Sequence, residues 1–189
     1  SIRGIIMSKE IINEAKQRME KSIVAFKEEL SQVRTGRANT SLVSNVEIDY
    51  YGTPTPIYQV ANVTVADARQ ITIKPYDKSE LKKIETAIIN ANLNLTPLND
   101  GVMIRVNVPA LTEERRKQYV KDVYGLAENA KVSIRNIRRD ANASLKKLEK
   151  EIPEDMLRKY NEDVQKATDE FIKKVDELTK EKEKELLTV

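Results

Sequence analysis

The sequence of 189 residues combines 40% hydrophobic with 33% charged residues and a formal net charge of +3, and it has two Phe and no Trp. This is enough apolar material for one ordinary domain or two small ones, and high charge with few aromatic residues is typical of long amphipathic helices. No apolar run approaches the roughly 20 residues of a membrane-spanning helix, and the absence of Cys and His excludes disulfides, thiolate metal sites, the serine triad and histidine-based acid–base pairs.

Residues 1–6 precede Met7, which we interpret as the natural start of the chain. They lack both the apolar core of a signal peptide and the Arg-rich amphipathic pattern of a transit peptide. We therefore expect residues 1–6 to be a leader left over from expression that lies outside the fold.

Between residues 8 and 33, apolar residues recur at intervals of three and four, which predicts one amphipathic helix with Ser8 as its N-cap. The pattern changes at residues 34–37. Five of the six Pro then lie between residues 54 and 109, and this concentration of helix breakers indicates a separate module.

Residues 37–110 form this module, which we interpret as a small α/β domain. Alternating apolar and polar residues predict a strand at 46–50, followed by a turn at 51–56. Asp77, with Glu80 three residues later, caps a helix expected at 78–92. Further strands are expected at 58–65, 70–74 and 102–108.

Two more long helices follow, at 111–151 and from Pro153 to about residue 187, each with one apolar seam. Three seams on three helices favour a three-helix bundle made of residues 7–36 and 111–189, with 37–110 inserted between its first and second helices. We therefore predict an α+β fold, an elongated bundle with a side arm. The two short linkers near Gly36 and Pro109 can act as a hinge.

The positive charge is concentrated in the second of these long helices. Residues 111–151 contain eleven basic and seven acidic residues, whereas residues 154–187 contain eight basic and eleven acidic ones. Spacings of four, three and four place Lys131, Arg135, Arg138 and Asn142 in one stripe, with Arg139 and Lys146 on its outer flank. Such a stripe can follow a phosphate backbone, and a preference for Arg favours bidentate phosphate binding.

The same stripe has a structural interpretation. Its cations can be a solvated face, or they can form salt bridges with the acidic last helix. The sequence has no phosphate-binding glycine motif and no cluster of metal ligands, so we expect no cofactor and no enzymatic activity.

Five separated motifs resemble the ribosome recycling factor family over Met7 to Val189. They are RTGRAN at 34–39, YYGTPTP at 50–56, PALTEERRK at 109–117, VSIRNIRRDAN at 132–142 and DVQKATD at 163–169.

This resemblance implies an L-shaped molecule whose three-helix bundle carries a β/α/β domain. It also implies a cytoplasmic translation factor, expected to be a monomer, that acts on the ribosome after termination together with elongation factor G and GTP, splitting the subunits and releasing mRNA and tRNA. The bundle would contact 23S-type rRNA at the A- and P-site region of the large subunit. The implied contacts are Arg34, Arg135 and Arg138, with Lys131, Arg139, Arg115 and Arg116 as supporting contacts by position; the implied hinge is Thr35, Gly36 and Arg37 with Val108, Pro109 and Ala110.

Two other classes of function remain open from the residues alone. A structural helical adaptor would dock an acidic protein on the bundle, although it has no evident need for an inserted domain between two linkers. A general RNA-binding protein would use the same stripe without ribosomal specificity, and it would bind unrelated duplexes equally well.

Overall fold

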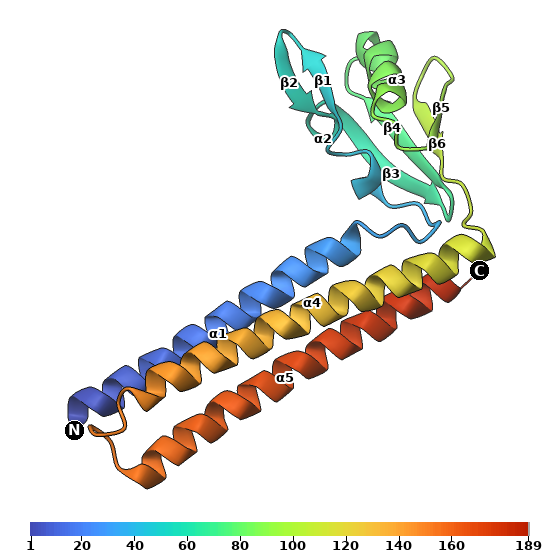
Figure 1. The fold of residues 1–189 in the computed structure, drawn as a ribbon. Helices are drawn as coiled ribbons and strands as arrows, with labels where there is room; N and C mark the ends of the chain where they lie inside the picture. The colour runs from blue at the N-terminus through green and yellow to red at the C-terminus, as the bar shows by residue number, and fades with distance from the viewer. Residues whose placement is uncertain (189) are drawn as a thin grey trace. The chain divides into compact units, whose positions relative to one another are not determined.

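The computed structural model describes residues 1–188. The chain divides into two compact units, one made of Ser1–Arg34 with Glu113–Val189 and the other of Thr35–Thr112. The first unit is a three-helix bundle and the second a small α/β domain (Figure 1). The predicted combination of a long bundle with an inserted α/β domain is thus confirmed.

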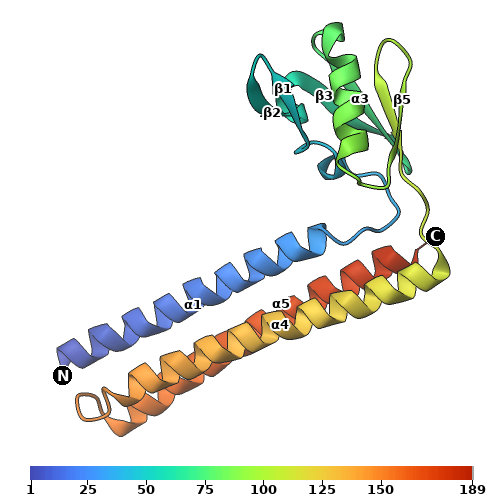
Figure 2. The ribbon, with the colours of Figure 1, turned by 45° about the horizontal axis from the view of Figure 1, so that its top comes forward.

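The bundle consists of α1 (Ile2–Ser31), α4 (Glu113–Lys146) and α5 (Glu154–Leu187) (Figure 2). The two longer helices have 34 residues each and are therefore about 50 Å long. The predicted seams face inward: Met19, Ile23 and Phe26 of α1 are at most 1% exposed, as is Ile134 of α4. Burial of these aliphatic seams holds the three helices together.

At the N-terminus, our expectation that residues 1–6 lie outside the fold is wrong. Helix α1 begins at Ile2, and Ser1 is its N-cap, whose hydroxyl accepts a hydrogen bond from Gly4 N at 3.1 Å. Gly4 is buried against the turn between α4 and α5, where Arg3 forms an ion pair with Glu151. Ser8 is not a cap either, because it is buried nearly two turns inside the helix and its hydroxyl donates to Gly4 O at 2.7 Å.

In the second unit, four strands form an antiparallel sheet in the order β3 (Ala61–Asp67), β4 (Gln70–Pro75), β6 (Ile104–Asn107), β5 (Thr96–Asn99). A separate hairpin joins β1 (Glu47–Tyr50) to β2 (Thr53–Pro56). Helix α3 (Leu81–Asn90) contacts both sheets, which gives the β/α/β arrangement. The short elements η1 (Thr40–Leu42), α2 (Ile57–Val60) and η2 (Lys78–Glu80) connect them.

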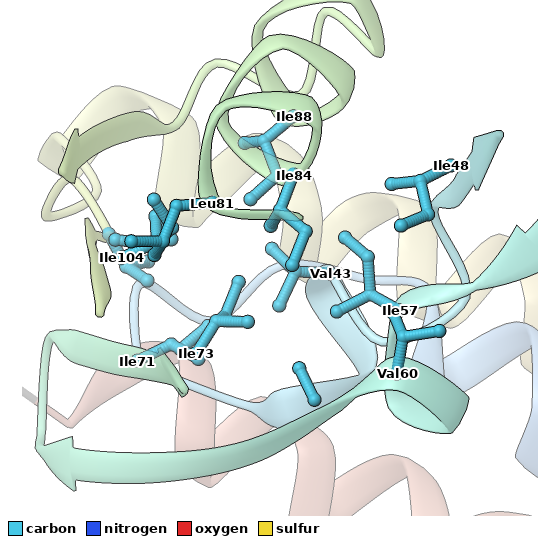
Figure 3. Packing of buried hydrophobic residues seen from close by; sticks show 13 residues of the cluster. Val43, Ile48, Ile57, Val60, Ile71, Ile73, Leu81, Ile84, Ile88 and Ile104 are labelled. Atoms are coloured by element: carbon cyan, nitrogen blue, oxygen red, sulfur yellow. The ribbon is translucent and has the colours of Figure 1, made fainter. Parts of the chain in front are cut away.

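One core joins these elements. Figure 3 shows Ile84 and Ile88 of α3 among Ile48 of β1, Ile73 of β4 and Val43. Each of these side chains is at most 4% exposed. The unit therefore has a hydrophobic core of its own, as an independent domain requires.

The observed strands of the α/β unit differ from the predicted ones at three places, and two of these places are strands that contain proline. The predicted turn at 51–56 is only Tyr51 and Gly52, both with positive φ, and Thr53–Pro56 is strand β2 instead. Strand β5, which contains Pro97, was not predicted. Both strands lie at a sheet edge, where a residue without an N–H can be accommodated. Residues 58–60 of the expected strand at 58–65 belong to α2 instead, and the strand begins at Ala61.

The packing of Gly4 gives a stability prediction. A Cβ at Gly4 would lie 2.9 Å from Ile152 Cγ2, so Gly4→Ala should lower the stability of the bundle by about 1–3 kcal/mol through overpacking. The control is the helical Gly125, whose Cβ would meet nothing within 4 Å; Gly125→Ala should raise stability by about 1 kcal/mol. Denaturant unfolding of both variants checks this, and equal stabilisation would mean that residues 2–6 do not pack on the bundle.

Candidate nucleic-acid interface

The basic stripe lies on the flank of α4 that faces α5. A seam with alternating spacings of four and three, running from Val123 through Ala127, Ala130 and Ile134, fixes the inward face of α4. The stripe residues lie beside this seam and are half-buried, whereas Arg139 and Lys146 on the outer flank are exposed. The stripe therefore borders both the bundle core and solvent.

The opposite flank of α4 faces α1. Arg18 Nη1 of α1 lies 3.1 Å from Asp140 Oδ2, and the hydroxyls of Ser22 and Ser133 are 2.9 Å apart. Residue numbers rise along α1 as they fall along α4 in these pairs, so the two helices are antiparallel. Asp140, the one acidic residue between Lys131 and Asn142, is thus engaged with α1.

On the stripe side, polar contacts between α4 and α5 repeat every seven residues. The Tyr124 hydroxyl donates a hydrogen bond to Glu183, and Lys131 Nζ lies 2.6 Å from Asp176 Oδ1. One further heptad along both antiparallel helices, Arg138 is matched with Asp169. We call these three matched positions the heptad ladder.

The third position of the heptad ladder differs from the second, because no direct ion pair forms there. Arg138 Nη1 donates to Gln165 Oε1 at 3.1 Å, and Gln165 Nε2 donates to Asp169 Oδ1 at 2.9 Å. Arg138 Nε is buried and has no hydrogen-bond partner within residues 1–188, and the same holds for Asn142 Oδ1 one turn along α4. Leaving buried polar atoms unpaired costs about 1–3 kcal/mol each, so stability alone does not account for this arrangement.

The cations of the stripe divide into two kinds. Lys131 and Arg135 have acidic partners, Asp176 and Glu128, with Arg135 Nη1 3.4 Å from Glu128 Oε1. Arg138 and Arg139 contact neutral amides, and neither forms an ion pair within the described part of the chain. Salt bridging to the last helix therefore holds for Lys131, whereas Arg135 pairs with Glu128 on α4 itself and Arg138 and Arg139 carry uncompensated charge.

The other predicted contacts lie at the far end of the bundle. Arg34 follows α1, and Arg115 and Arg116 lie in the first turn of α4, about 30 Å along that helix from Arg135. Arg116 is half-buried and continues the line of the apolar seam, whereas Arg115 is exposed. The seven predicted residues thus form two groups rather than one.

The six predicted hinge residues lie in two segments without regular structure. Gly36 has a φ of +76°, and a Cβ there would lie 3.1 Å from Leu111 N, so the two segments run side by side. Val108 is 5% exposed, and its N–H donates to Arg69 O at 2.9 Å. It therefore belongs to the core of the α/β unit although it follows β6, and the linker on that side begins at Pro109.

Sequence reasoning missed the acceptors on α5, namely Gln165, Asp169 and Asp176. A signal was present in the sequence. In two antiparallel helices with heptad seams, the two residue numbers of each facing pair add up to the same total, so the partner of each residue can be calculated from one known pair.

Within residues 1–188, no helix is long and apolar enough to span a membrane, and no cluster of acidic side chains could hold a metal ion.

The first position of the heptad ladder can be tested by titration. The hydrogen bond to Glu183, together with burial and the negative charges of Glu183 and Asp176, raises the pKa of Tyr124 above its usual 10. The neutral phenol is favoured in the folded state, so this contribution to stability is complete below pH 10 and is lost as pH rises through the raised pKa. In NMR titrations of ring-labelled Tyr, Glu183→Gln should shift the titration of Tyr124 to lower pH. An unchanged pKa would contradict the contact.

Comparisons with known proteins support one family. The model of the family described as "Ribosome recycling factor" matches residues 26–187. A ribosome-recycling factor of Geobacillus sp. (strain WCH70) is 57% identical over 185 residues, covering 97% of this chain and 100% of that protein, and one of Bacillus subtilis (strain 168) is 55% identical with the same coverage.

Solved structures agree with the sequence comparisons. A solution structure of the ribosome recycling factor aligns with a TM-score of 0.78 at 38% identity, covering 96% of this chain and 98% of that one. The T. thermophilus ribosome recycling factor, in models that also include E. coli elongation factor G bound to the E. coli post-termination complex, aligns with a TM-score of 0.65 at 43% identity, covering 96% and 99%. With a match over nearly its whole length, this chain belongs to the ribosome recycling factor family.

Proposed function

We propose that this protein binds the post-termination ribosome through its helical bundle and, with elongation factor G and GTP, promotes splitting into subunits and release of mRNA and tRNA. Membership of the family supports this, as does the structural neighbour described with elongation factor G and a post-termination complex. The observation that carries it is the uncompensated Arg138 at the border of the α4–α5 flank.

Ribosomal RNA of the large subunit is the proposed target of the stripe. A phosphate backbone offers a row of anionic oxygens, and each phosphate neutralised by Arg or Lys releases counterions. Arg138 and Arg139 supply charge that acidic side chains have not already neutralised. Lys131 and Arg135 must exchange Asp176 and Glu128 for phosphate, so they contribute less to affinity.

The second group, Arg34, Arg115 and Arg116, would extend the interface along the bundle. Arg115 and Arg116 lie about 30 Å along α4 from Arg135, several times the spacing of successive phosphates, so the two groups would contact separate stretches of RNA. A long, rigid bundle suits this task because it keeps the two groups at a fixed separation.

The protein's own part in the reaction is steric on this proposal. The partner hydrolyses GTP, and the linkers at 35–37 and 109–112 let the α/β domain move while the bundle stays bound. Because no bond is made or broken by this chain, the absence of His and Cys from the sequence is not an obstacle.

The stripe is tested by binding to isolated large ribosomal subunits across a salt series. Arg138→Ala should weaken binding about tenfold or more and reduce the slope of log K against log salt by about one, because one phosphate contact is lost. The control is Lys173→Ala on the exposed face of α5, which should bind as the wild type does. If Arg138→Ala binds normally and only unfolds at a lower temperature, the stripe is a structural network.

The hinge is tested by two glycine substitutions with the same backbone penalty. Gly36 and Gly52 have φ of +76° and +83°, so Ala at either costs about 1–2 kcal/mol of local strain, but only at Gly36 does the new Cβ press on the other linker, at Leu111. Gly36→Ala should keep large-subunit binding and slow factor-dependent splitting of ribosomes, whereas Gly52→Ala should leave both binding and splitting unchanged. Equal splitting rates would argue against a hinge at this position.

A further inference from the structure

The third position of the heptad ladder contains a neutral residue between two charges. Arg138 can only donate hydrogen bonds, and the carboxylate of Asp169 can only accept them. The amide of Gln165 meets both needs at once, with Oε1 accepting from Arg138 and Nε2 donating to Asp169. These two partners fix the orientation of the amide, because the reverse orientation would oppose donor to donor and acceptor to acceptor.

Without Gln165, the register of the helices would bring Arg138 and Asp169 together. At the neighbouring position, one heptad away on each helix, Lys131 contacts Asp176 directly at 2.6 Å. Arg has a longer reach than Lys and a fork that fits a carboxylate. A direct ion pair is therefore the default contact of this register, and Gln165 replaces it at Arg138.

We propose that Gln165 is a positioning residue, which separates Arg138 from Asp169 and so keeps the charge of that arginine available for RNA phosphate. This inference rests on the proposed function. The contact with the amide orders the guanidinium group without neutralising it, whereas a contact with a carboxylate would have to be broken before phosphate could bind. Gln165 itself touches no RNA in this account.

The first test replaces the neutral spacer by a charged one. Gln165→Glu places a carboxylate against Arg138, so binding to large ribosomal subunits should weaken about tenfold and the salt slope should fall by about one. The control is Gln17→Glu, which adds the same charge at nearly the same level of the bundle, beside the Arg18 that pairs with Asp140, on the exposed side of α1. Gln17→Glu should bind nearly as the wild type does.

The second test distinguishes positioning from a structural role. Gln165→Ala removes the spacer and lets Arg138 pair with Asp169, so binding should weaken as in Gln165→Glu. Adding Asp169→Asn to Gln165→Ala removes the competing carboxylate, and binding should recover to within about threefold of the wild type. A merely structural role of Gln165 predicts no recovery, because the double variant has lost one more native contact.

The outcomes separate this inference from the proposed function. If Arg138→Ala weakens binding but Gln165→Glu binds like Gln17→Glu, or if the double variant stays as weak as Gln165→Ala, the positioning role is refuted and the function of the stripe stands. If Arg138→Ala binds like the wild type, the stripe does not hold RNA and both proposals fall. Thermal unfolding of each variant shows whether the bundle remains folded.

Discussion

The antiparallel register of α4 and α5 is the constraint on which the candidate interface depends. Heptad seams on both helices must face each other to be buried, and this fixes which side chains meet at the edge of the seam. Lys131 meets Asp176 and Arg138 is matched with Asp169 for this reason. A shift of α5 by one residue relative to α4 would expose the apolar seam and would also break the contacts of the heptad ladder. Stability and the distribution of available charge are therefore set by the same packing.

Much of the fold follows from local patterns in the sequence. The apolar spacing on the three long helices predicted their inward faces, since an amphipathic helix has one way to bury its seam. Pro153 correctly marked the break before α5. The errors arose where a tertiary contact overrides a local signal. Ile2–Ile6 is helical because Gly4 fits against the α4–α5 turn, and Thr53–Pro56 is a strand because a sheet edge accommodates proline.

The candidate site was predictable only in part. Spacing on one helix was sufficient to place Lys131, Arg135 and Arg138 in a stripe, because all three lie on α4. It could not show that Lys131 is neutralised whereas Arg138 is not, since the partners of these two residues, Asp176 and Gln165, lie on α5. Availability of charge is a property of the packed bundle rather than of any one helix.

The two units differ in their charge and in their packing. The bundle is long and rigid and carries the uncompensated cations, whereas the α/β unit has its own core and is joined to the bundle by two short irregular segments. Separate cores allow each unit to keep its own fold when the segments between them change conformation. Gly36, with its positive φ and its closeness to Leu111, is the residue at which the two segments constrain each other.

Site-specific photo-cross-linking tests the central claim, that the α4–α5 flank faces RNA, most directly. A photoreactive side chain at position 142, on the stripe, should cross-link to large-subunit rRNA, and the same group at position 17 on the exposed side of α1 should not. Equal cross-linking from both positions, or cross-linking from position 17 alone, would contradict the account and would place the RNA-binding face elsewhere on the bundle.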